Sequence, residues 1–141
     1  MDLSTQFVTY GGIILAVLGL IYAQVTYSNL KSMPRGNDTQ KKLGATIYDG
    51  AMSFIQQEYK YITIFVLVVG SLLFFYFGKE TALAYFGGAI LSMTCGWAGM
   101  TSACIANSRT AQAAASDGQG SALATAFKGG SVMGFSVASL G

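Results

Sequence analysis

Charged side chains that could do chemistry are few in this chain, and they lie mainly outside its long apolar runs. The 141 residues include eight basic residues, six acidic residues and no histidine. Imidazole is therefore absent as a proton relay or metal ligand. Arg109 and Lys128 flank a polar turn. They could raise the positive potential near an anionic substrate, or they could anchor the chain at a membrane surface, and we favour anchoring.

The acidic residues do not form the pattern of a metal site. Asp49, Glu58 and Asp117 fall at or beyond the ends of the apolar runs, and no two carboxylates stand four residues apart. No cage of oxygen ligands for Mg²⁺ or Ca²⁺ is therefore encoded. A nucleophile–base pair and a phosphate-binding P-loop are also missing from the sequence. We predict no catalytic, cofactor-binding or metal-binding residue.

The two cysteines, Cys95 and Cys104, are nine positions apart in one apolar run. On a helix they would point to opposite sides, about 13 Å apart along the axis. That separation excludes a disulfide between them and a shared metal ion. We interpret both as small packing residues.

Composition indicates the kind of element that must position these side chains. The chain is 52% hydrophobic and 10% charged, with a mean hydropathy of +0.50. Soluble domains carry about 25% charged residues, so this is an integral membrane protein. A net charge of +2 is too small to indicate a nucleic-acid partner. The first apolar run follows Asp2 without any basic residue, which favours a retained transmembrane helix over a signal peptide.

We predict an all-α membrane domain of antiparallel transmembrane helices, three complete and a truncated fourth. The expected segments are a first helix at 3–27, a cytoplasmic loop at 28–37, an amphipathic extension with the second helix at 38–78, a third helix at 81–115 and a partial helix at 121–141. Asn37 and Gln40 have the spacing of a capping box at the start of the second helix. After Lys128 the uncharged residues reach only about 20 Å, short of a bilayer core of about 30 Å. We therefore expect the chain to be the N-terminal piece of a larger protein.

Small residues recur on the expected third and fourth helices. Gly88, Ser92 and Gly96 stand four residues apart, and Gly99 lies on a neighbouring stripe. Gly130 and Gly134 form a similar stripe near the end of the chain. Small residues let membrane helices approach closely. We predict that all six pack against other helices.

Basic residues predict the orientation in the membrane. Seven of the eight fall on one side of the predicted spans, and Lys79 falls alone on the other; the seven are Lys31, Arg35, Lys41, Lys42, Lys60, Arg109 and Lys128. Because cytoplasmic loops carry the excess of Lys and Arg, the N-terminus is predicted on the non-cytoplasmic side.

Three segments in series resemble the membrane-integral, ion-pumping inorganic pyrophosphatases. The first is IYDGAMSF at 47–54 with EYK at 58–60, the second is GWAGM at 96–100 with ANSRT at 106–110, and the third is ALATAFKGGSVMG at 122–134. Order and spacing match the family pattern from about residue 40 onward. Asn107, Arg109 and Lys128 lie at motif positions whose role the resemblance does not define.

The resemblance implies a homodimeric pump that hydrolyses pyrophosphate on the cytoplasmic side with Mg²⁺, and with K⁺ as a further candidate cofactor. Such a pump moves H⁺ or Na⁺ across a bacterial inner membrane or an acidic organelle membrane. The family's catalytic and gating residues begin on the fifth helix, so none can be assigned to a position here. The implied role is an outer-helix scaffold, inactive alone, whose partners are the bilayer and the other helices of the pump.

Two alternatives from other classes remain open. One is a self-contained small oligomeric protein, such as a rotor or channel subunit. An ion-carrying rotor subunit would need a carboxylate in the middle of a span, and this sequence has none there. The other is a non-catalytic assembly factor, which composition alone does not distinguish from a scaffold.

Overall fold

The computed structural model describes residues 3–141, with side-chain environments from Gln6 onward. These residues form four α-helices and no strand, which confirms the all-α class: α1 (Leu3–Ser32), α2 (Asp38–Phe77), α3 (Lys79–Ser116) and α4 (Gln119–Leu140). By length and composition, the segments Gln6–Ser32, Asp38–Phe77 and Lys79–Ser116 could each cross a membrane. The described chain thus offers three candidate spans.

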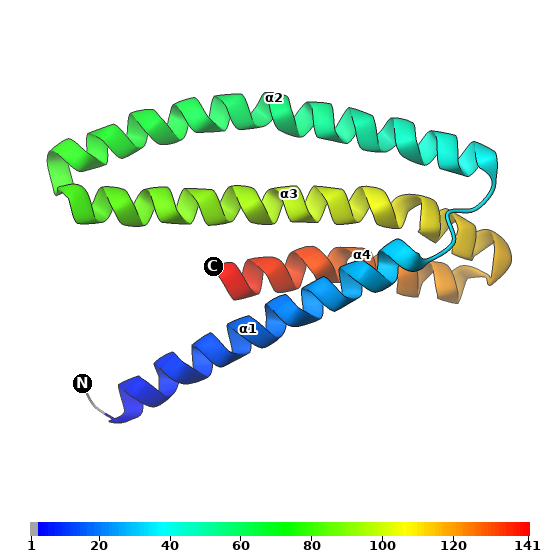
Figure 1. Cartoon of the computed structure of the whole chain (residues 1–141), viewed down its shortest axis with the longest axis horizontal. Coiled ribbons are helices and arrows are strands. Elements are labelled where there is room, and N and C mark those ends of the chain that lie inside the picture. Colours follow the sequence, from blue (N-terminus) through cyan, green and yellow to red (C-terminus); the bar gives the residue numbers. More distant parts are fainter. Residues whose placement is uncertain (1–2) are drawn as a thin grey trace.

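The helices lie in a row in which α3 is central (Figure 1). α2 packs along one side of α3, and α4 packs along the other. α1 packs mainly on α4 and touches α3. The end of α1, the start of α2 and the turn between α3 and α4 gather at one end of the molecule, while the N-terminal part of α1 diverges from its neighbours (Figure 1). We call the end where α1 stops and α2 starts the loop end.

Two of the connections are very short and depend on glycine. Gly78 alone separates α2 from α3 and has φ +86°, and Gly118 precedes α4 with φ +86°. Residues with a side chain rarely adopt this backbone conformation. The chain can therefore reverse within one or two residues at each site.

Several helix boundaries differ from the expected ones. α1 continues to Ser32 instead of ending at Tyr27, because nothing in the sequence interrupts it before Pro34, which disfavours helix at Met33. Lys79 and Glu80, expected in a loop, form the first turn of α3.

The predicted capping box at the start of α2 is confirmed. Asn37 Oδ1 accepts from the Gln40 backbone N–H at 2.9 Å, and Gln40 Oε1 accepts from the Asn37 backbone N–H at 2.8 Å. Two N–H groups that lack helical partners are satisfied in this way. α2 then runs without a break from its amphipathic part into its apolar part, as predicted.

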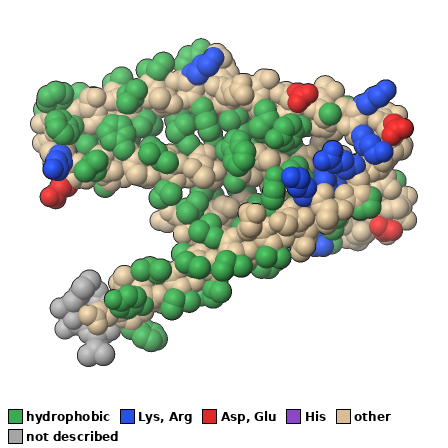
Figure 2. All heavy atoms as spheres, viewed as in Figure 1, with side chains coloured by type: hydrophobic (Ala, Val, Ile, Leu, Met, Phe, Trp, Pro, Cys, Tyr) green, Lys and Arg blue, Asp and Glu red, His purple; other side chains and the backbone are tan. Residues whose placement is uncertain are grey.

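Buried residues are most numerous on α3. They are Ala82, Cys95, Gly99, Thr101, Ser102, Cys104, Ala106 and Arg109 on α3, compared with Thr125, Gly129, Val132 and Ser136 on α4 and Ile55 and Gly70 on α2. Much of the apolar surface faces outward instead, for example Phe75, which is 82% exposed. Figure 2 shows apolar side chains along the outside of the helices. Such a surface suits lipid or further helices rather than water.

Candidate functional site

The most unusual side chain is Arg109, a cation that is only 3% exposed. Its Nη1 donates to the carbonyl of Ile105 at 2.8 Å, one turn earlier on α3. Its Nη2 donates to the carbonyl of Lys31 at 2.8 Å, in the last turn of α1. Nε has no hydrogen-bond partner among the described residues. Arg109 is therefore buried between helices, not exposed at a surface as an anchor would be.

The end of α1 explains this placement. The last carbonyls of a helix have no partner within it, and they carry the negative end of the helix dipole. A guanidinium suits this position, because it donates hydrogen bonds to the unpaired carbonyls and its positive charge is attracted to the negative end of the dipole. α3 carries Arg109 to this point because α3 extends past the predicted bilayer core to the loop end.

Arg109 lines a pocket of about 310 Å³ between α1, α2 and α3, which we call the basic pocket. Its charged and aromatic lining residues are Lys31, Arg35, Lys41, Arg109, Asp49, Tyr27 and Tyr48. Lys41 is paired with Asp38 at 3.0 Å. Figure 2 shows Lys and Arg side chains gathered at this end of the molecule. With four basic side chains and one carboxylate in its lining, the pocket favours an anion.

The other two motif positions lie apart from this pocket. Asn107 is exposed on α3, and Lys128 is exposed on α4. Neither lines the basic pocket. Of the three motif residues named from the sequence, the structure therefore places only Arg109 in a polar pocket.

The predicted packing residues differ in their surroundings. A Cβ on Gly99 would come within 2.7 Å of the Met133 side chain, and one on Gly96 would lie 3.2 Å from Tyr59 Oη. A Cβ on Gly88, Gly130 or Gly134 would meet nothing within 4 Å in the described chain, and Ser92 is exposed. For these four positions, packing against other helices stays a prediction.

α3 and α4 also approach each other closely at Gly129, a packing position that the sequence analysis did not predict. A Cβ there would lie 2.5 Å from Ala106 Cβ, and the Gly129 carbonyl accepts from Ser102 Oγ at 3.0 Å. The signal was present in the sequence, because the small residues Thr125, Gly129 and Ser136 recur at helical spacing. All three are buried on α4.

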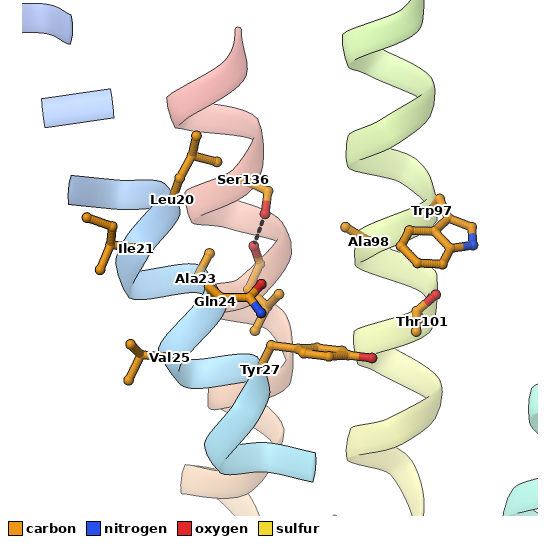
Figure 3. A pocket seen from close by; sticks show the side chains of 11 residues that line it. Leu20, Ile21, Ala23, Gln24, Val25, Tyr27, Trp97, Ala98, Thr101 and Ser136 are labelled. Atoms are coloured by element: carbon orange, nitrogen blue, oxygen red, sulfur yellow. Dashed lines mark hydrogen bonds between the residues drawn. The ribbon is translucent and has the colours of Figure 1, made fainter. Parts of the chain in front are cut away.

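A second hollow, which we call the apolar groove, has a volume of about 660 Å³ and runs between α1, α3 and α4 (Figure 3). Its lining residues are Leu20, Ile21, Ala23, Gln24, Val25 and Tyr27 of α1, Trp97, Ala98 and Thr101 of α3, and Val132 and Ser136 of α4. Ser136 Oγ is occupied, because it donates to the Val132 carbonyl at 2.7 Å. Thr101 Oγ1 is buried without a hydrogen-bond partner in the described part of the chain. Tyr27 lines both the groove and the basic pocket.

The described residues do not fit a magnesium site. They contain no group of three His, Cys, Asp or Glu residues that could hold a metal ion. Cys95 and Cys104 are both buried and free, as predicted, and Cys95 Sγ donates to the Ser136 carbonyl at 3.6 Å. The arrangement of the described residues is suited to anion binding and helix packing.

Known proteins match almost the whole chain. Residues 17–141 match the family model described as inorganic H⁺ pyrophosphatase. A Clostridium tetani protein, provisionally named a K⁺-stimulated pyrophosphate-energized sodium pump, is 42% identical over 129 residues, which are 92% of this chain and 19% of that protein.

Two further relatives differ in the ion that they are named for. A Pyrobaculum aerophilum K⁺-insensitive pyrophosphate-energized proton pump is 33% identical over 92% of this chain and 19% of its own length. A Thermotoga maritima K⁺-stimulated pyrophosphate-energized sodium pump is 34% identical over 88% of this chain and 17% of its own length. The chain therefore spans about a fifth of the length of the curated relatives that it matches.

Proposed function

Because this chain belongs to the inorganic H⁺ pyrophosphatase family, we propose that it forms the outer-helix scaffold of a pyrophosphate-energised ion pump. The observation that carries the proposal is the family match over residues 17–141, combined with the small share of each relative that the chain covers. The relatives include both sodium and proton pumps, so the comparison supports either ion.

In this proposal α1, α2 and α3 cross the bilayer in alternating directions. The gathering of the α1–α2 connection and the α3–α4 turn at one end supports this arrangement. The loop end faces the cytoplasm, because it holds most of the Lys and Arg side chains, including Lys31, Arg35 and Arg109. The N-terminus then lies on the non-cytoplasmic side.

Catalysis is assigned to other parts of the pump. Hydrolysis of pyrophosphate needs carboxylates that hold Mg²⁺ against the phosphate oxygens. Because the described residues provide no such group, we propose that Mg²⁺, any K⁺ and pyrophosphate bind outside this chain. The open faces at Gly88, Gly130 and Gly134 would pack against the other helices of the pump or against a second copy.

A hydrolysis assay tests the first half of the proposal. The purified chain in detergent is incubated with Mg²⁺, K⁺ and pyrophosphate, and phosphate release is measured beside the full-length Thermotoga maritima relative. We expect release from the relative and none above background from this chain. Phosphate release above background from this chain would refute the proposal that catalysis belongs to other parts of the pump.

A chimera tests the second half. Residues 17–141 replace the matching part of the Thermotoga maritima relative, and pyrophosphate hydrolysis by purified membranes is measured. We expect an assembled and active chimera, because the scaffold helices and the catalytic helices come from one family. A chimera that fails to assemble, together with a defined ring-sized oligomer of the chain alone, would favour a self-contained small membrane protein instead.

A further inference from the structure

We propose that the basic pocket and the apolar groove together bind one anionic phospholipid, with its phosphate in the pocket and an acyl chain in the groove. The inference goes beyond the scaffold role and does not depend on it, since it requires only that the chain resides in a membrane. It assigns a ligand class to two hollows that the family resemblance and the relatives' names leave without one.

The first argument is that Arg109 has no ion-pair partner among the described residues. The guanidinium is almost fully buried, and its hydrogen bonds go only to the carbonyls of Ile105 and Lys31. Among the described residues the one ion pair joins Lys41 to Asp38, so no carboxylate pairs with Arg109, although Asp49 lines the same pocket. A buried cation without an anionic partner is costly. A phosphate group would supply the missing charge and an acceptor for the unpaired Nε.

The second argument is the chemistry of the remaining lining. Arg35 and Lys31 are exposed and reach the same pocket, so a bound phosphate would meet several donors. Arginine suits phosphate oxygens because its donors form a planar fork. Basic pockets between membrane helices are typical sites for lipid head groups.

The third argument is that the two hollows adjoin along α1 and α3. On α3 the groove is lined down to Thr101, and the pocket begins one turn later at Cys104. On α1 the groove ends at Tyr27, which also lines the pocket, as Figure 3 shows by its ring reaching from α1 toward α3. The result is a polar head site followed by an apolar track, which is the chemical pattern of a phospholipid.

Free phosphate and a lipid head group share the chemistry that the basic pocket recognises. The apolar groove distinguishes them, because inorganic phosphate would leave it unused whereas an acyl chain would fill it. Leu20, Ile21 and Val25 supply the kind of surface that an acyl chain contacts. We therefore assign the site to a lipid.

Native mass spectrometry of the purified chain tests the assignment. Phosphatidylglycerol is titrated against phosphatidylcholine with identical acyl chains, and inorganic phosphate is titrated separately. Both lipids carry a phosphodiester, but phosphatidylcholine adds a choline cation, which the basic residues of the pocket repel. We therefore expect phosphatidylglycerol to be retained at about tenfold lower concentration than phosphatidylcholine. Equal retention of the two lipids would overturn the proposal.

The pocket is tested by mutating its exposed basic residues and not Arg109, because an Arg109 variant would also lose the contact to α1. Arg35→Gln and Lys31→Gln should each abolish most of the preference for phosphatidylglycerol. Lys60→Gln and Lys79→Gln are the matched controls, since they remove the same charge outside the pocket. Circular dichroism and gel filtration confirm that each variant is folded. A loss of preference in the controls as large as in the pocket variants would contradict a specific site.

The groove is tested by filling it. Ala98→Leu places a larger side chain in the groove, and Ala84→Leu adds the same bulk at an exposed position of α3 outside it. We expect Ala98→Leu to weaken phosphatidylglycerol retention and Ala84→Leu to leave it unchanged. Tight binding of inorganic phosphate, with no effect of Ala98→Leu on the lipid, would show a free-anion site and overturn the lipid assignment.

Discussion

Arg109 on α3 donates a hydrogen bond of 2.8 Å to the backbone carbonyl of Lys31 in the last turn of α1, joining residues 78 positions apart. This contact is made where α1 would otherwise end in unpaired carbonyls. Together with the packing of α1 on α4, it holds α1 at the loop end, although the N-terminal part of α1 diverges from the other helices (Figure 1). One side chain thus ties the first helix to the central one.

Replacing Arg109 should loosen the loop end. Arg109→Ala removes both carbonyl contacts, and we expect a loss of about 1–2 kcal/mol in the free energy of unfolding. Cys104 lies in the same pocket and is buried, so its labelling by maleimide should become faster. Cys95, buried against α4, is the internal control and should label at an unchanged rate. Equal rates of Cys104 labelling in the parent and the variant would argue against a role of Arg109 in holding α1 against α3.

The contact at Gly129 should be sensitive to added bulk. Gly129→Leu would drive a side chain into Ala106 of α3, and we expect a loss of about 1–3 kcal/mol, measured by thermal unfolding in detergent. The matched control is Gly130→Leu, since a Cβ there meets nothing within 4 Å. Similar melting temperatures for the two variants would contradict the orientation of α4 in which Gly129, and not Gly130, faces α3.

The same control variant tests the predicted packing faces. In the chimeric pump, Gly130→Leu should reduce assembly, although it should be tolerated in the isolated chain. Gly96→Leu should also impair the chimera, because a Cβ at Gly96 already lies 3.2 Å from Tyr59 Oη. Normal yield and activity of the Gly130→Leu chimera would show that this face does not pack against the other helices of the pump. Normal behaviour of the Gly96→Leu chimera would contradict the close contact with Tyr59 of α2.

The phenol of Tyr59 on α2 should contribute to the α2–α3 contact, because its hydroxyl donates to the Met93 carbonyl. Tyr59→Phe keeps the ring and removes the donor, so we expect a loss of about 0.5–1.5 kcal/mol in thermal unfolding. Tyr61→Phe removes an equivalent hydroxyl from a side chain that is 66% exposed and should have no effect. Equal changes in thermal stability for the two variants would show that the Tyr59 hydrogen bond does not stabilise the α2–α3 contact.

The capping box should hold the first turns of α2. Asn37→Ala leaves the Gln40 backbone N–H without its acceptor, and we expect a local cost of about 0.5–2 kcal/mol. Hydrogen exchange over residues 38–45 should become faster, whereas Gln57→Ala, an exposed mid-helix change, should leave those residues unchanged. Unaltered exchange in the Asn37 variant would show that the start of α2 is fixed by other contacts.

Most of the basic pocket could not be predicted from the sequence. The basic residues that form the pocket were identified, but only as indicators of orientation, and Arg109 was interpreted as a surface anchor. Its burial depends on the end of α1, which lies 78 positions away in the chain. The helical spacing of Thr125, Gly129 and Ser136 is visible in the sequence, but the packing prediction named Gly130 and Gly134, where an added Cβ would meet nothing within 4 Å in the described chain.

The sequence by itself determined the membrane class, the all-α fold, the cap of α2 and the resemblance to ion-pumping pyrophosphatases. These features are local, since they depend on apolar length, on side chains within four residues and on short motifs. The tertiary structure alone decided that Arg109 meets Lys31 and that Gly129, not Gly130, contacts α3. Adjacent helix positions point about 100° apart, so a run of small residues cannot reveal which of them faces a neighbour until the packing of distant helices sets the rotation.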